Sequence, residues 1–185
     1  PGSGTIPAVY SARLRLAKMA GERVMDLLKE DIKQSDIITE KAIENAMRTD
    51  MAIGCSTNTI LHLTAIAHAA GHDINLSDLN DMGNSTPQIC KLNPASSVFI
   101  TDLNDVGGMQ AVIKELASCG LIHTDCLTVN GTVADRVAKA PNADGTVIRK
   151  LSDPFSKDGG IAVLKGNLAE EGAVVKKGAV APEMM

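Results

Sequence analysis

Aromatic residues are almost missing from this sequence. The chain contains no tryptophan, one tyrosine and two phenylalanines, so its core must be built from aliphatic side chains and methionine. This shortage excludes the nucleic-acid modules that stack bases on aromatic rings. A formal net charge of −4 also gives no basic footprint for a phosphate backbone. We therefore expect no nucleic-acid partner.

Long hydrophobic runs and a signal-peptide pattern are lacking as well. No apolar stretch approaches the roughly 20 residues that cross a bilayer, and the N-terminus does not have the successive regions of a secretory signal. The apolar content of 44% is ordinary for a globular protein. We therefore expect a soluble, cytoplasmic protein with no membrane partner.

Cysteines are few, and their pattern matches no metal motif. Their spacings of 35, 29 and 7 residues contain no CxxC pair and no ferredoxin run. Without a secretory signal, a disulfide framework is not expected. We interpret the four as free thiols, buried or partly buried. They are Cys55, Cys90, Cys119 and Cys126.

Both ends of the chain resemble the ends of a fragment and not natural termini. The sequence opens at Pro1 without an initiator methionine and stops at Met185, directly after a strand-like stretch. We interpret the chain as an interior fragment of a longer protein.

Helical patterns fill the first three quarters of the chain. Apolar residues recur at helical spacing over 9–28, and Thr39 is suited to cap a second helix through residue 51. A third helix is expected from 56 to Gly71. Its apolar residues occupy most of the helix circumference, which predicts a buried helix. We expect three further helices. Ser77 is suited to cap the first, the second spans 109–119 and ends at Gly120, and the third starts at Thr132.

The pattern changes after residues 141–145. Short β-type runs at 147–148, 161–164 and 173–175 are separated by Gly, Pro, Asp and Asn clusters. A helical body followed by close-set strands predicts an α/β protein. We place a domain boundary between residues 143 and 144, which divides the chain into 1–143 and 144–185.

Four sequence blocks resemble the dihydroxy-acid and phosphogluconate dehydratase family, and they occur in family order and at family spacing. Within the third block, Asp125-Cys126-Leu127-Thr128-Val129 is similar to the dihydroxy-acid branch. One departure is Cys55, which stands where the family has a second glycine before Ser-Thr-Asn. The first block is Pro1-Gly2-Ser3-Gly4-Thr5-Ile6-Pro7-Ala8, and the third and fourth are Leu121–Val129 and Gly159–Ala169. The second block is Gly54-Cys55-Ser56-Thr57-Asn58-Thr59, with Leu61-His62-Leu63 and Ala65-Ile66-Ala67-His68.

The resemblance implies a fold and a reaction. The fold would be the helix-rich part of the family's N-terminal α/β domain, followed by the first strands of a swivelling β-rich domain. The reaction would be dehydration of a 2,3-dihydroxy carboxylate to a 2-oxo acid in valine, isoleucine and leucine biosynthesis. An iron–sulfur cluster, [2Fe–2S], would act as Lewis acid on the 3-hydroxyl, Mg²⁺ would bind the carboxylate and 2-hydroxyl, and a serine would take the C2 proton. The family enzymes pair as homodimers.

The family's metal-binding and catalytic blocks do not occur in this sequence. The Cys-Asp-Lys block, the other cluster cysteines and the Thr-Asp-Gly-Arg-x-Ser block with the serine base are all missing. We therefore assign no metal ligand and no catalytic residue to this chain, and we expect the fragment itself to be inactive and to bind neither cofactor.

The candidate substrate-binding residues are Ser56, Thr57 and Asn58. At a helix N-terminus, free backbone N–H groups and the helix dipole attract an anion, so a substrate carboxylate is a suitable ligand. These residue types are equally the ordinary N-cap residues. His62 and His68 lie on an apolar helix and are interpreted as hydrogen-bonded core histidines.

Three alternatives stay open. His123-Thr124-Asp125 could form a base and its orienting partner, but without a nucleophile motif a turn is the expected structure. The parent protein could instead be a sugar-acid dehydratase, acting on an aldonate or phosphogluconate. The chain could also be a scaffold without catalytic function.

Overall fold

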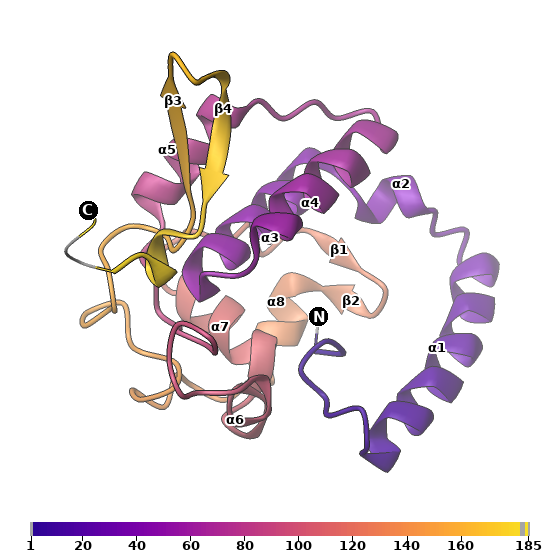
Figure 1. The fold of residues 1–185 in the computed structure, drawn as a ribbon. Helices are drawn as coiled ribbons and strands as arrows, with labels where there is room; N and C mark the ends of the chain where they lie inside the picture. The colour runs from indigo at the N-terminus through magenta and orange to yellow at the C-terminus, as the bar shows by residue number, and fades with distance from the viewer. Residues whose placement is uncertain (1, 182–183, 185) are drawn as a thin grey trace.

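The computed structural model describes residues 2–181 and 184. Helices dominate the described part of the chain (Figure 1). They are α1 (Ser11–Lys29), α2 (Gln34–Ile37), α3 (Glu40–Ile53), α4 (Thr57–Ala69), α5 (Leu76–Ser85), α6 (Ile100–Asp105), α7 (Gly108–Ala117), α8 (Val133–Ala138) and the 3₁₀ helix η1 (Lys177–Ala179).

The strands form two small antiparallel pairs. Strand β1 (Leu127–Thr128) pairs with β2 (Gly131–Thr132), and β3 (Ala162–Gly166) pairs with β4 (Ala169–Val175). A helix-rich body with small strand pairs agrees with the predicted α/β fold class.

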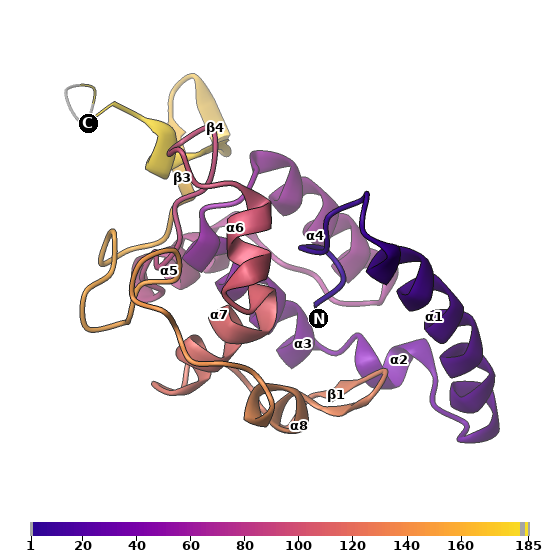
Figure 2. The same ribbon diagram turned by 90° about the horizontal axis from the view of Figure 1, so that it is seen from below.

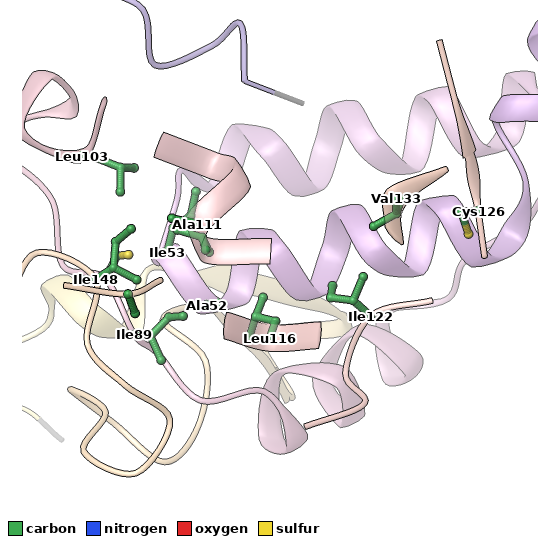
Figure 3. Close-up of a cluster of buried hydrophobic side chains, with 13 residues drawn as sticks. Ala52, Ile53, Ile89, Leu103, Ala111, Leu116, Ile122, Cys126, Val133 and Ile148 are labelled. Atoms are coloured by element: carbon green, nitrogen blue, oxygen red, sulfur yellow. The ribbon is translucent and has the colours of Figure 1, made fainter. Parts of the chain in front are cut away.

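Helix α3 lies at the centre because it contributes side chains to two clusters of buried hydrophobic residues. Ala52 and Ile53 join the first cluster with residues of α7 and the segment 122–148 (Figure 3). Met47 and Met51 join the second, which includes Leu79 of α5. The helix begins where the hydroxyl of Thr39 accepts a hydrogen bond of 3.3 Å from the Ala42 nitrogen, as the sequence predicted.

The β3–β4 hairpin is fixed to the body at its base. The nitrogen of Gly159 donates to the Gly83 carbonyl oxygen at 2.8 Å, and the nitrogen of Gly160 donates to that of Met51 at 2.9 Å. Val163 of β3 is buried in the second cluster. The far end of the hairpin projects away from the body (Figure 1).

Helix α1 stands apart from the rest of the molecule in both ribbon views (Figures 1 and 2). None of its residues is buried. It is tied to the body by polar contacts: Arg23 donates to the carbonyl oxygen of Val129 at 2.5 Å. Its apolar residues remain largely exposed, namely Leu14, Met19, Val24, Met25 and Leu28.

The expectation that α4 is buried is wrong. Only Ile60 and Ala67 are buried, whereas Leu61 is 66% exposed. The helix lies on the surface and contacts α3 and β4. Leu63 packs against the second cluster, whereas Leu61 and Ile66 remain exposed. None of the helices in the described ranges is long and apolar enough to span a membrane.

Several smaller sequence predictions meet mixed outcomes. Thr132 caps α8, and Gly120 takes a positive φ after α7 ends at residue 117, as expected.

The cap of α5 is Asn75 and not Ser77, because the Asn75 amide oxygen accepts from the Asp78 nitrogen. The predicted strand at 147–148 is not a strand, since residue 148 is a buried loop residue of the first cluster. Helices α2 and α6 were not predicted.

The proposed domain boundary between residues 143 and 144 stays a prediction. Ala143 and Ile148 belong to the same buried cluster, so apolar packing continues across this point of the chain. Regular α-helix ends at residue 138, and the next regular elements are β3 and β4.

Candidate functional site

The turn between α3 and α4 presents an open helix N-terminus. Gly54 ends α3 in the left-handed conformation, with φ 58°. Ser56 then begins α4, and its hydroxyl accepts a hydrogen bond of 3.2 Å from the Asn58 nitrogen. Ser56, Thr57 and Asn58 are all exposed. The N-cap expected from the sequence is therefore present and accessible to a solute.

A cavity of about 560 Å³ lies beside this turn. Cys55, Thr59 and Leu63 line it from one face of α4, whereas Ser56, Thr57 and Asn58 are not among its lining residues. The predicted turn therefore borders the cavity through its two flanking residues. The other walls come from α3, α7, the N-terminal loop 2–4 and the segment 122–133.

Asp50, in the last turn of α3, supplies the one charged side chain among the described residues that line the cavity. It is 3% exposed, and neither carboxyl oxygen has a hydrogen-bond partner. Burial raises the pKa of Asp50 to about 6. The nearby Cys55 thiol, Thr59 hydroxyl and Lys176 ammonium limit this rise, although the first two remain outside hydrogen-bond geometry.

Three other polar side chains of the cavity wall are satisfied within the chain. The Asn45 side chain donates to the His123 carbonyl oxygen at 2.9 Å and accepts from the His123 nitrogen at 2.8 Å. Thr49 donates to the Asn45 carbonyl oxygen, and Thr128 donates to that of Gly131. Among the described lining residues, Asp50 is the one whose buried side-chain oxygens lack a hydrogen bond.

The segment His123-Thr124-Asp125 contains a turn at residues 124–125, as expected, and His123 is bound to α3. Its Nε2 atom lies 2.7 Å from Oε2 of Glu44, whose Oε1 accepts from Arg48 at 2.9 Å. These two partners, His123 first, hold the pKa of Glu44 below its ordinary value. The contacts attach the segment 121–126 to the wall of the cavity.

The interpretation of His62 and His68 as core histidines is wrong. Both are exposed, because they lie on the outward side of α4. His68 pairs with Asp73 through its Nδ1 atom at 3.0 Å. Neither histidine lines the cavity.

The four cysteines are free, as expected: Cys90 and Cys126 are buried, Cys55 is half-buried and Cys119 is exposed. Burial raises the pKa of the Cys90 thiol to about 12, which suits a core thiol. Within residues 2–181 and 184, no three Cys, His, Asp or Glu side chains converge as metal ligands would. The residues present therefore fit neither an iron–sulfur cluster nor a carboxylate-bound Mg²⁺, and no chemical step is assigned to either group here.

A ligand-sized cavity beside an exposed helix N-terminus is typical of proteins that bind small molecules. The match to known proteins then defines the family. The model of the dihydroxy-acid/6-phosphogluconate dehydratase N-terminal domain matches residues 1–136, and the model of the C-terminal domain of the same family matches residues 146–185. The chain belongs to the dihydroxy-acid/6-phosphogluconate dehydratase family.

Curated relatives narrow the comparison to one branch. The chain is 56% identical over its whole length to the dihydroxy-acid dehydratase of Agathobacter rectalis, and 33% of that relative is covered. It is 54% identical to the enzyme of the same name from Syntrophobacter fumaroxidans and 53% identical to that of Acetivibrio thermocellus, again over the whole chain and with 33% and 34% of the relatives covered. The chain thus spans about a third of the length of these relatives.

Proposed function

We propose that a full-length protein containing this segment is a hydro-lyase that dehydrates 2,3-dihydroxy carboxylates to 2-oxo acids in branched-chain amino-acid biosynthesis. The observation that carries the proposal is the identity of 53–56% over the whole chain to proteins named dihydroxy-acid dehydratase. The family match over both domain models supports it. We place this protein in the cytoplasm as a homodimer.

The cofactors of the full-length protein are proposed to be a [2Fe–2S] cluster and Mg²⁺, held by residues outside this chain. When bound, these groups would supply Lewis-acid stabilisation of the leaving hydroxide. The described part of the chain brings no ligand set together for them. We propose that the segment contributes substrate contacts and structural support and has no activity by itself.

Ser56, Thr57 and Asn58 are proposed to bind the substrate carboxylate. They are exposed at the N-terminus of α4, which has 13 residues. The backbone N–H groups of a first helical turn and the positive end of the helix dipole favour an anion. The Asn58 side-chain amide is exposed and adds a donor that can meet a ligand oxygen.

The test is an anaerobic assay of the full-length protein with 2,3-dihydroxy-3-methylbutanoate and, separately, 6-phosphogluconate. We expect 2-oxo acid to form from the first at a kcat/KM at least about tenfold higher, a difference of about 1.4 kcal/mol. A preference for 6-phosphogluconate would assign the protein to the sugar-acid branch. Absence of product from both acids, with cluster and Mg²⁺ present, would contradict the proposed function.

A further inference from the structure

The Asp50 carboxyl is a buried polar group that lacks a partner. Asp50 is only 3% exposed, and neither of its carboxyl oxygens accepts a hydrogen bond. A buried carboxyl without hydrogen bonds is costly, more so when it is ionised. Native proteins pair such groups, so an isolated one indicates that a binding partner belongs beside it.

The cavity in front of Asp50 is far too large for a bridging water alone. Its volume is about 560 Å³, against about 30 Å³ for one water molecule. Its walls are chiefly apolar, and some of these side chains are left partly open to solvent; Val129 is 44% exposed. Covering them would be favourable in proportion to the apolar area removed from water. The apolar residues that line it include Leu63, Met109, Ile113, Leu127 and Val129.

We infer that this cavity is an intramolecular docking site: in the full-length protein, an apolar segment from outside these 185 residues covers it and places a lysine or arginine side chain against Asp50. The inference rests on the family assignment and does not depend on which acid is dehydrated. It assigns a binding role to a carboxyl that the proposed substrate contacts do not use.

Three observations favour a polypeptide segment as the occupant. The curated relatives are about three times as long as this chain, so most of the full-length protein lies outside it. The cavity walls come from several separate stretches, including loop 2–4, α3, α4 and α7, which suits an extended contact. No Lys, Arg or His occurs among the described lining residues. Lys176 acts on Asp50 through its charge but makes no hydrogen bond to it. The carboxylate is therefore open to a cationic side chain that donates hydrogen bonds, and such bonds are strong.

The first experiment compares three full-length proteins by thermal unfolding: wild type, Asp50→Asn and Asp50→Leu. A cationic partner would be left buried and unpaired by Asp50→Leu, so we expect the Tm to fall in the order Asp, Asn, Leu. If no partner is present, the substitution removes an unpaired carboxyl and the Tm rises. An unchanged or raised Tm for Asp50→Leu would therefore overturn the inference. Asp105→Leu, at an exposed residue on the end of α6, controls for the substitution itself.

The second experiment identifies the occupant. A photo-reactive benzoylphenylalanine at Val129, on the cavity rim, is irradiated in the full-length protein, and the joined peptides are read by mass spectrometry. A cross-link within one subunit to a peptide outside these 185 residues supports the inference. A cross-link only to a second subunit, or only to peptides of this segment, overturns it, as does a protein with no cross-link. Failure of the dehydration assay would leave both results unaffected, so the two proposals can fail separately.

Discussion

The nitrogen of Gly160 donates a hydrogen bond of 2.9 Å to the carbonyl oxygen of Met51. This contact joins the segment matched by the C-terminal family model to the last turn of α3. A Cβ atom on Gly160 would lie 2.5 Å from the Cα atom of Gly54, a distance that forces two backbones apart. The absence of a side chain at Gly160 is therefore required for the hairpin to meet the body.

Gly160→Ala is expected to destabilise the chain by about 2–3 kcal/mol, because backbone and not a flexible side chain must move. Gly166→Ala is the matched control: a Cβ there has no heavy atom within 4 Å, and we expect a change within about 0.5 kcal/mol. Urea unfolding of both variants measures the difference. Equal urea midpoints for Gly160→Ala and Gly166→Ala would show that the backbone at Gly160 moves to accept a Cβ atom without loss of stability.

Asp50→Asn should change how stability depends on pH in the 185-residue chain. The folded-state pKa of about 6 lies above the ordinary value of 3.8, so the folded state holds this proton more tightly than the unfolded state. Below pH 4 the protonated Asp50 carboxyl therefore does not lower the free energy of unfolding. That free energy decreases as the pH rises towards 6 and above, because Asp50 then has to ionise while buried. The asparagine variant lacks this titration.

The stability difference between wild type and Asp50→Asn should therefore shift by about 2 kcal/mol in favour of the variant from pH 4 to pH 7. Urea unfolding at both pH values measures it. The comparison isolates Asp50, because the other carboxyl groups are the same in both proteins. A difference that does not vary with pH would mean that the Asp50 carboxyl already has a partner in the isolated chain.

Asn58→Ala tests the proposed carboxylate contact in the full-length protein. Loss of a hydrogen bond to a charged group should lower kcat/KM by about ten- to a hundredfold, or about 1.5–3 kcal/mol. The iron content should be unchanged. Asn84→Ala, at an exposed asparagine on α5, serves as the control and should leave the kinetics unaltered. Unchanged kinetics for Asn58→Ala would leave this turn with its N-cap function alone.

The isolated 185-residue chain is expected to bind no iron–sulfur cluster after anaerobic reconstitution. Its four cysteines do not converge with other ligands in the described part of the chain, and Cys90 is a deeply buried thiol. Iron analysis and the visible absorption spectrum measure the outcome. A stoichiometric chromophore that disappears in Cys126→Ala would refute the expectation.

Local signals predicted the helix ends well because capping depends on a few adjacent atoms. Thr39, Ser56 and Thr132 each accept a backbone hydrogen bond at the start of a helix, and side-chain type alone indicates this. The cap at Asn75 was missed since Ser77 lies two residues away and is an equally good capping residue. The hydroxyl of Ser77 instead donates to the Asn75 side chain.

Tertiary placement was not accessible in the same way. The apolar circumference of α4 predicted burial, but what a helix packs against depends on chain far away in the sequence, and here the contacts with α3 and β4 leave Leu61 and Ile66 exposed. The position of Asp50 in the sequence could have indicated the cavity, but the sequence analysis did not use it. Asp50 follows Met47 by three residues, so it lies on the apolar face of α3, where a carboxyl is unusual.

The dehydration reaction itself is tested most directly by running the full-length protein anaerobically in D₂O with 2,3-dihydroxy-3-methylbutanoate and measuring the mass of the product. Loss of the 3-hydroxyl and the C2 proton gives an enol, which takes its new C3 hydrogen from solvent. We expect a 2-oxo acid that carries one deuterium at C3. A product without deuterium, or no 2-oxo acid from a protein that holds its cluster and Mg²⁺, would contradict assignment of this chain to a dihydroxy-acid hydro-lyase.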